Sequence, residues 1–271
     1  MNSPPRVTFR AAAWAVTVVV FFAAAVAAAF LWRTRASTDP LESMVAKLSA
    51  LDDDMRHKLC AHRSNNVPKY RAANELFHCI EIDVVLNPTV GGPAAVYHPP
   101  VENHHGLTLE FLLANEGLPR GHLWLDVKDL SDDNWSAFLA MLLTLIPPER
   151  RSDIIIETGW ETAGVREAAA GFRREGFIFS YYLPTEAAIE CGAVRSQECM
   201  QLRAEVLQAV GMGFSHLSFD ARAYPFVQSI RADLPPFMRL LTWHVSRDWP
   251  LLDLMNQVEV YIVRFPSPYS T

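Results

Sequence analysis

The chain has 271 residues, of which 50% are hydrophobic and 20% are charged, and its formal net charge is −6. This composition excludes intrinsically disordered, collagen-like and small disulfide-stapled proteins, because enough apolar side chains are present to build a sizeable core. Residues 1–35 hold four of the 24 basic residues and no acid, so residues 36–271 carry 20 bases, 30 acids and a net charge of −10. An acidic body of this kind argues against nucleic acid as a partner, which needs basic patches.

An apolar segment runs from residue 11 to residue 32, with Thr17 as its single polar side chain and an arginine at each flank. At about 1.5 Å per residue, a helix of this length spans about 33 Å, which is enough for the hydrocarbon core of a bilayer. Trp14 and Trp32 lie near its ends, where amphipathic rings prefer the membrane interface. The segment predicts a transmembrane helix through which the protein contacts a membrane.

Two other interpretations of this segment stay open. A buried core helix would need a polar stripe toward solvent, and a cleavable signal peptide usually has an apolar region of roughly 7–15 residues. We expect an uncleaved signal anchor.

The flanking arginines are balanced between the two ends of the segment, so charge does not set its orientation. Long domains are exported largely regardless of charge, so we expect the body outside the cytoplasm, periplasmic or extracellular.

Downstream of the anchor, short β-branched or aromatic runs alternate with longer amphipathic ones. The predicted strands are residues 58–63, 79–86, 122–130, 153–158, 177–183, 216–220, 239–245 and 258–265. The predicted helices include residues 67–77, 108–114, 133–145, 162–175, 197–210 and 251–257. Such alternation indicates parallel strands joined by crossover helices.

Eight strand–helix units match the size of a closed β/α barrel, typically about 250 residues. A doubly wound open sheet is the alternative; if it bound a nucleotide, it would usually have a glycine-rich turn after its first strand, and residues 60–66 contain no glycine. We therefore expect an α/β protein with a single (β/α)8 TIM barrel over residues 58–271. An N-terminal tail (1–10), the transmembrane anchor (11–32) and a linker with a leading helix (33–57) precede it.

Three acidic residues lie on two successive predicted strands. Glu81 and Asp83 face the same side of their strand because strand side chains alternate, and Asp126 lies on the next. Inward carboxylates are costly unless a cation holds them together. The set predicts an all-oxygen site for one divalent cation, Mg²⁺ or Ca²⁺.

Two histidines and a lysine accompany these acids. His62 ends the first strand, His98 follows the second strand in a loop, and Lys128 lies two residues beyond Asp126. Histidines that flank a metal ion can carry the two proton transfers of phosphate ester cleavage, and a fixed ammonium offsets charge on the phosphoryl group. The residue types therefore indicate phosphodiester chemistry.

The same residues carry a family resemblance. The runs are Ala61-His62-Arg63, Glu81-Ile82-Asp83-Val84, the later His98, and Leu125-Asp126-Val127-Lys128. This pattern resembles the phospholipase-C-like phosphodiesterase barrels, which include the glycerophosphodiester phosphodiesterases and spider-venom sphingomyelinase D. The runs Val96-Tyr97-His98-Pro99-Pro100 and Gly106-Leu107-Thr108-Leu109-Glu110-Phe111-Leu112 are most similar to the menorin family.

The resemblance implies His62 and His98 as an acid–base pair and Lys128 as a charge beside the phosphate. It implies Glu81, Asp83 and Asp126 as metal ligands. The chain departs from the glycerophosphodiesterase pattern at two positions, since Ser64 stands in place of a glycine and Pro99 in place of an acid. An acid beside His98 would orient its ring and raise its basicity.

Several further residues are weaker candidates. Arg63, Asn66, Glu157 and Arg264 are expected to contact substrate, and Asp220, Trp243 and His244 could line the pocket. Cys60 and Cys79 should point into the barrel on neighbouring strands, as two buried thiols or as a disulfide. Cys191 and Cys199 are eight residues apart, within bridging reach.

The leading hypothesis is a membrane-anchored, metal-dependent phosphodiesterase that cleaves a glycerophosphodiester or a lipid headgroup phosphodiester. The nucleophile is water or the substrate's own neighbouring hydroxyl, which would give a cyclic phosphate. Two alternatives stay open. One is a non-catalytic, menorin-like ligand-binding or adhesion domain on the same barrel. The other is a barrel enzyme of another kind, because the fold alone implies no chemistry.

Overall fold

The computed structural model describes residues 40–86, 94–100, 106–159, 165–192, 196–244 and 252–265. The chain divides into two compact units, Met1–Lys47 and Leu48–Thr271, and the second contains the barrel. No helix within the described ranges has the length and apolar character that crossing a bilayer requires. The membrane helix predicted for residues 11–32 lies outside these ranges.

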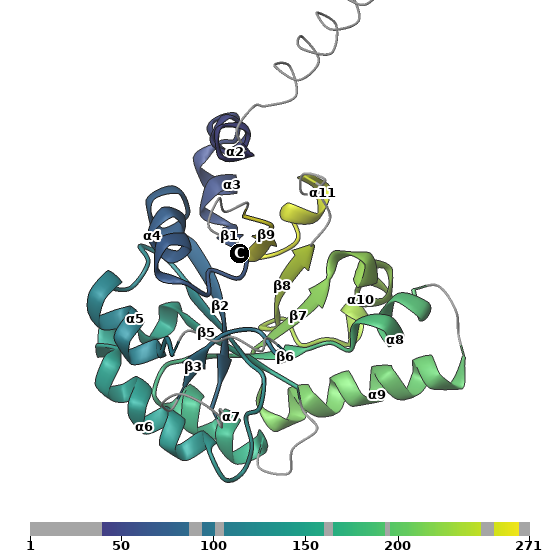
Figure 1. Cartoon of the computed structure of the whole chain (residues 1–271). Helices are drawn as coiled ribbons and strands as arrows, with labels where there is room; N and C mark the ends of the chain where they lie inside the picture. The colour runs from purple at the N-terminus through teal and green to yellow at the C-terminus, as the bar shows by residue number, and fades with distance from the viewer. Residues whose placement is uncertain are drawn as a thin grey trace, which may run out of the picture. The chain divides into compact units, whose positions relative to one another are not determined.

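Eight parallel strands form a closed β-barrel with helices around it (Figure 1). The strand order is β1-β9-β8-β7-β6-β5-β4-β2, and β1 also pairs with β2, which closes the ring. The strands are β1 (Leu59–Ala61), β2 (Cys79–Val85), β4 (Leu123–Val127), β5 (Ile154–Thr158), β6 (Ile178–Tyr182), β7 (His216–Asp220), β8 (Arg239–His244) and β9 (Val260–Val263). The TIM barrel prediction is confirmed, and the open sheet is excluded because β1 bonds to both of its neighbours.

Each predicted strand is present, although most are shorter than expected. The first strand shows a reason: it was predicted to extend to Arg63, but Arg63 has a φ of 50°, which is outside the extended region and ends the strand. The chain therefore leaves β1 at His62 and turns at the carboxyl end of the strand.

Among the described residues, two helices precede β1 in the chain and the others follow strands, as the crossover topology requires. The helices are α2 (Pro40–Ser49), α3 (Asp53–His57), α4 (Val67–Leu76), α5 (Leu109–Glu116), α6 (Trp135–Leu145), α7 (Val165–Arg174), α8 (Thr185–Glu190), α9 (Gln197–Met212), α10 (Tyr224–Ile230) and α11 (Leu252–Met255). Short 3-10 turns lie at η1 (Pro148–Asp153), η2 (Ala221–Ala223) and η3 (Arg231–Asp233). The side chains of Asn66, Thr108 and Ser196 cap α4, α5 and α9, which fixes where these helices begin.

One short strand was not predicted. β3 (Ala95–Val96) pairs antiparallel with the end of β2, where Val84 lies opposite Val96. The backbone N–H of Leu109, at the start of α5, donates to the carbonyl of Ala94 at 2.9 Å. These bonds hold the segment that leads to His98 against the carboxyl end of β2.

Inward-pointing side chains fill the barrel interior. The buried cluster consists of Cys60, Cys79, Trp124, Ile155, Leu241, Val260 and Ile262, with Trp243 and Ile178 packed against it. Burying an aliphatic side chain of this size contributes roughly 1.5–3 kcal/mol to stability. This cluster fills the barrel interior, so any ligand site on the barrel axis must lie between the cluster and an open end of the barrel.

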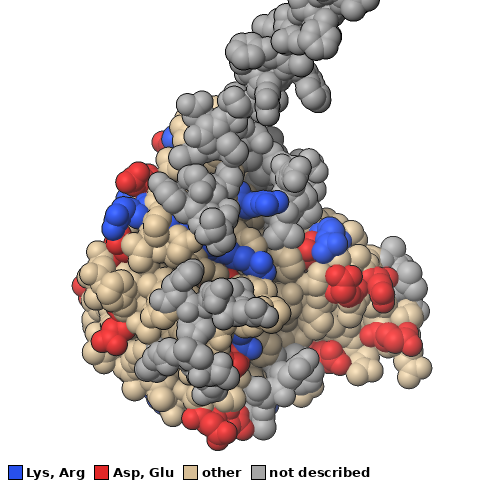
Figure 2. Space-filling model, viewed as in Figure 1, with Lys and Arg blue, Asp and Glu red and all other residues tan. Residues whose placement is uncertain are grey.

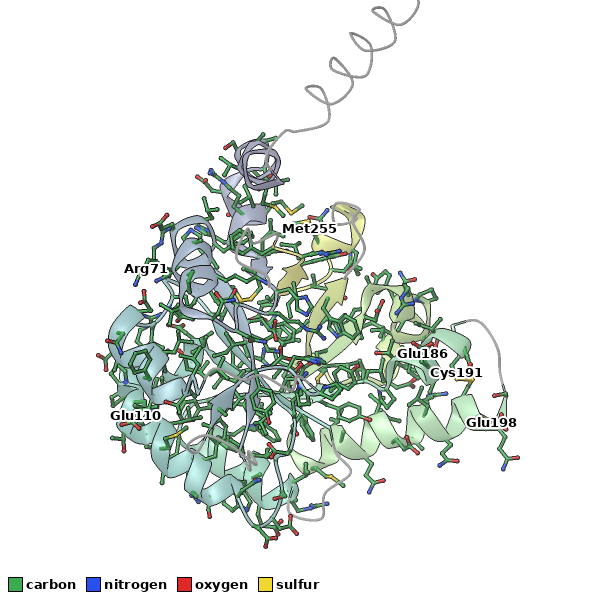
Figure 3. The ribbon with its side chains drawn as sticks, in the orientation of Figure 1. Arg71, Glu110, Glu186, Cys191, Glu198 and Met255 are labelled. Carbon is green, nitrogen blue, oxygen red and sulfur yellow. A yellow bond between two sulfur atoms is a disulfide. The ribbon has the colours of Figure 1, made fainter. Side chains whose placement is uncertain are left out.

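Both cysteine pairs form disulfides. Cys60 and Cys79 are register partners on β1 and β2 and are bonded with a sulfur–sulfur distance of 2.08 Å, so the interpretation as two free thiols is wrong. Cys191, at the end of α8, is bonded to Cys199 in the first turn of α9 at 2.04 Å (Figure 3). No free cysteine occurs among the described residues.

Candidate functional site

The strand register brings the predicted carboxylates together. Asp83 on β2 is the direct neighbour of Asp126 on β4, and Asp126 is the direct neighbour of Glu157 on β5. Glu81 lies two residues before Asp83 and so faces the same side of β2. One carboxylate oxygen each from Glu81, Asp83 and Asp126 lie within 4.8 Å of one another, which is close enough for all three to bind one ion.

A cavity of about 370 Å³ opens above this cluster at the carboxyl ends of the strands. Predicted site residues that line it are His62, Arg63, Glu81, His98, Asp126, Lys128 and Glu157. Active sites of TIM barrels form at this end of the barrel. The cavity is therefore the candidate functional site.

Lys128 lies among the acids. Its ammonium nitrogen is 2.8 Å from a carboxylate oxygen of Asp83 and forms a second ion pair with Asp126. Burial by itself lowers the pKa of this amine, but the two carboxylates outweigh burial and raise it. Lys128 therefore stays charged and already neutralises part of the acidic cluster.

Of the three acids, Glu81 has the environment that most disfavours the charged form. It is buried, and its pKa is raised well above the ordinary value, first by burial and then by the charges of Asp83 and Asp126. Burial also raises the pKa of Asp126. A cluster with one ammonium for three acids has negative charge that a divalent cation would offset, and its donors are all oxygens, so the residues fit Mg²⁺ or Ca²⁺.

The two histidines stand in different environments. His62 lies with its Nε2 atom 3.9 Å from Glu81, and burial followed by the charge of Arg63 lowers its pKa to about 3. His98 is less buried, and burial lowers its pKa as well. Burial therefore disfavours the protonated form of both rings, and it disfavours that of His62 the more strongly.

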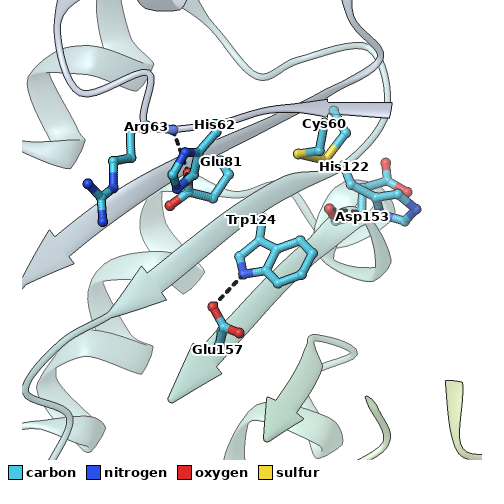
Figure 4. The surroundings of a disulfide bond; sticks show 9 residues. Cys60, His62, Arg63, Glu81, His122, Trp124, Asp153 and Glu157 are labelled. Atoms are coloured by element: carbon cyan, nitrogen blue, oxygen red, sulfur yellow. Dashed lines mark hydrogen bonds and ion pairs between the residues drawn. A yellow bond between two sulfur atoms is a disulfide. The ribbon is translucent and has the colours of Figure 1, made fainter. Parts of the chain in front are cut away.

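The loop after β1 contacts the acids directly. The backbone N–H of Arg63 donates to Glu81 at 2.5 Å, and the guanidinium of Arg63 lies 3.8 Å from Asp83. The side-chain amide of Asn65 donates to Asp83 at 2.6 Å. Figure 4 shows the His62–Arg63 end of this loop over Glu81.

Two predicted contact residues do not line the cavity. Asn66 accepts a hydrogen bond from the backbone N–H of Lys69 at 2.8 Å and so caps α4. Arg264 is exposed and is absent from the described residues that line the cavity. Of the weaker candidates, Trp243 lines the cavity, Asp220 pairs with Arg222 instead, and the side chain of His244 lies outside the described residues.

Glu157 is held by two donors inside the barrel. The indole N–H of Trp124 donates to one of its oxygens at 2.9 Å (Figure 4). The hydroxyl of Ser218 donates to the other oxygen. Burial and, next, the charge of Asp126 raise the pKa of Glu157 to about 8. Glu157 is therefore a fixed carboxyl group at the side of the cavity, next to the acidic cluster but separate from it.

The cavity has an aromatic side that the sequence did not reveal in full. The rings of Tyr182 and Trp243 stack, with centroids 6.1 Å apart and an interplanar angle of 11°. Alternation along β6 and β8 could have placed both rings inside the barrel. Only the strand register brings them to the same side of the cavity.

Acidic side chains also gather away from the cavity. Figure 2 shows them over the region of α8 and α9, where Glu186 and Glu198 lie (Figure 3). The carboxylates of the site therefore account for only part of the negative charge of the body.

No model of a known protein family matches the chain, and no curated protein matches it either. The chemistry of the site itself must carry the functional argument.

Proposed function

We propose that the protein is a metal-dependent phosphodiesterase of the phospholipase-C-like type, most similar to the menorin family, that acts on a glycerophosphodiester or a lipid headgroup phosphodiester. The observation that carries this proposal is a cavity lined by two histidines, a lysine and two acids, Glu81 and Asp126, with the third acid of the cluster, Asp83, beside Asp126 but not among the lining residues. Cleavage of a phosphodiester needs a proton acceptor, a proton donor and positive charge at the phosphate. The cavity supplies a residue for each role.

Glu81, Asp83 and Asp126 would hold the cation. When bound, the ion polarises the phosphoryl oxygens as a Lewis acid. Lys128, which stays charged, adds a second positive group beside the phosphate. The fully buried Asp83 and nearly buried Glu81 hold their positions without help from solvent.

Their different environments suit the two histidines to different roles in proton transfer. His62, whose pKa is about 3, is neutral across the physiological range and is suited to accept the proton of the nucleophile. His98 is less buried and is the better candidate to donate a proton to the leaving oxygen. The nucleophile is water or a neighbouring hydroxyl of the substrate.

The two disulfides support a location outside the cytoplasm. Disulfides persist in oxidising compartments and are rare in the reducing cytosol. We therefore propose that residues 11–32 anchor the protein in a membrane and that the barrel lies on the periplasmic or extracellular side.

The proposal is tested with the full-length chain purified in detergent and assayed against bis(p-nitrophenyl) phosphate and a panel of glycerophosphodiesters. Rates are compared with Mg²⁺, with Ca²⁺ and with chelator. Activity that depends on the cation and falls in His62→Ala and His98→Ala supports the proposal. Activity that is unchanged in both variants would refute it.

A non-catalytic binding domain is the second candidate, and two observations favour it. Lys128 already bridges Asp83 and Asp126, so part of the acidic cluster is neutralised without any ion. Pro99 also stands where an acid would orient His98. Absence of hydrolysis across the whole panel, together with saturable binding of a phosphodiester, would favour this candidate.

A further inference from the structure

Two adjacent asparagines in the loop after β1 have different partners. Asn66 turns toward its own helix and caps α4. Asn65 turns toward β2, where its side-chain N–H donates to the Oδ2 atom of Asp83 at 2.6 Å and its side-chain oxygen accepts from the backbone N–H of Asp83 at 2.9 Å. Asn65 thus binds the side chain and the main chain of one residue at once.

This pair of bonds fixes the carboxylate of Asp83. Because Oδ2 is held by Asn65, the other oxygen points toward the cluster, where it lies 2.8 Å from the nitrogen of Lys128. Asp83 is fully buried, so solvent cannot replace a lost hydrogen bond. The donated hydrogen bond also favours the ionised form, and Asn65 is among the groups that keep the pKa of Asp83 below its ordinary value despite burial.

The same loop is tied to the second carboxylate of β2. The backbone N–H of Ser64 donates to the carbonyl of Glu81 at 2.9 Å, and that of Arg63 donates to the side chain of Glu81 at 2.5 Å. The loop that carries His62 is therefore attached to β2 through the residues of the acidic cluster. Asn65 supplies the last of these attachments, the two hydrogen bonds to Asp83, which the guanidinium of Arg63 approaches only to 3.8 Å.

We propose that Asn65 is a positioning residue that orients Asp83 toward a divalent cation and keeps the His62 loop in register with β2. Hydrogen-bond partners of this kind, which orient metal ligands without touching the ion, typically change metal affinity about 10- to 100-fold. The inference rests on the proposed metal site but does not require hydrolysis.

The test measures binding of Mg²⁺ and Ca²⁺ to the metal-free full-length chain by titration calorimetry, well below the melting temperature of each variant. Asn65→Ala should weaken binding about tenfold or more. The control is Asn134→Ala, because Asn134 also makes two hydrogen bonds, accepting from the N–H of Ser131 and donating to the carbonyl of Asp129. The control should bind the ion like the wild type.

A second variant separates the hydrogen bonds from the shape of the side chain. Asn65→Leu keeps the approximate size and shape of the side chain, adds no charge and loses both hydrogen bonds to Asp83, so it should bind the ion as weakly as Asn65→Ala. For any substrate that the wild type hydrolyses, excess cation should restore the kcat of Asn65→Ala.

Three results would overturn the proposal: wild-type affinity in either Asn65 variant, equal losses in Asn65→Ala and Asn134→Ala, or no cation binding by the wild type. If the wild type binds the ion, Asn65→Ala loses it and neither hydrolyses any phosphodiester, the role of Asn65 stands and the proposed enzymatic function fails.

Discussion

Cys60 and Cys79 lie opposite each other on β1 and β2, and two residues further along the same strands lie His62 and Glu81. The disulfide thus bonds the two strands that close the barrel, two residues before the proposed base His62 and the proposed metal ligand Glu81 (Figure 4). β1 has only three residues and pairs with β2 at two positions, so the covalent bond adds to a short ladder.

Removal of this disulfide should lower both stability and activity. Cys60→Ala with Cys79→Ala should reduce the free energy of unfolding by about 3 kcal/mol, the value for a loop of this length, and should lower kcat because the His62 loop loosens. The matched control replaces Cys191 and Cys199 by alanine. These two cysteines are closer in sequence and neither lines the cavity, so this variant should lose less stability and keep its kcat. Denaturant unfolding and steady-state rates at low temperature measure both effects, and equal kcat in the two double variants would contradict the prediction.

Replacement of either histidine should reduce the rate without preventing folding. General acid–base catalysis contributes about 10²- to 10⁴-fold, so His62→Ala and His98→Ala should each lose about that factor in kcat. Because burial keeps the pKa of His62 near 3, the fall in rate at high pH should belong to His98. The pH profile of kcat tests this assignment: a high-pH limb that persists unchanged in His98→Ala would be evidence against it.

Lys128 should compete with the cation for the same carboxylates. Lys128→Met removes the ammonium from Asp83 and Asp126, and breaking such a pair costs on the order of 3 kcal/mol, less here because the lysine is 24% exposed. The metal-free variant should therefore melt at a lower temperature than the wild type. Added Mg²⁺ or Ca²⁺ should then raise its melting temperature by more than it raises that of the wild type. An equal or smaller increase would show that Lys128 does not compete with the ion for these acids.

Glu157 should make the metal-free protein less stable as the pH rises. Its folded pKa is about 8 against an ordinary value of 4.5, so between these values the folded state holds a proton that the unfolded state has lost. The free energy of unfolding must therefore fall with rising pH through this window. His62 has the opposite effect between about 3 and 6.5, so the range from 6.5 to 8 isolates the effect of Glu157 from that of His62.

Glu157→Gln, which cannot ionise, should flatten that fall. The measurement is denaturant unfolding of both proteins in chelator at several pH values between 6.5 and 8. If the two proteins have parallel slopes across this range, Glu157 is already ionised in the folded state.

The sequence alone was sufficient to predict the eight barrel strands and the order of the acids along them. Strand side chains alternate with a period of two, which is a local property, so it places Glu81 and Asp83 on one face of β2 whatever the strand pairs with. The eight strand–helix units likewise indicated a parallel barrel, and the barrel is closed as expected.

Tertiary structure decided everything that depends on register and on loop conformation. Asn65 and Asn66 have the same side chain and adjacent positions, yet one binds Asp83 and the other caps α4. The backbone of Asn66 is extended, and adjacent side chains of an extended segment point to opposite sides. The disulfide between Cys60 and Cys79 depends on the pairing of β1 with β2, which sets the two residues opposite each other. Alternation tells which face of a strand a residue occupies, but only the pairing of strands across the barrel tells which residues meet.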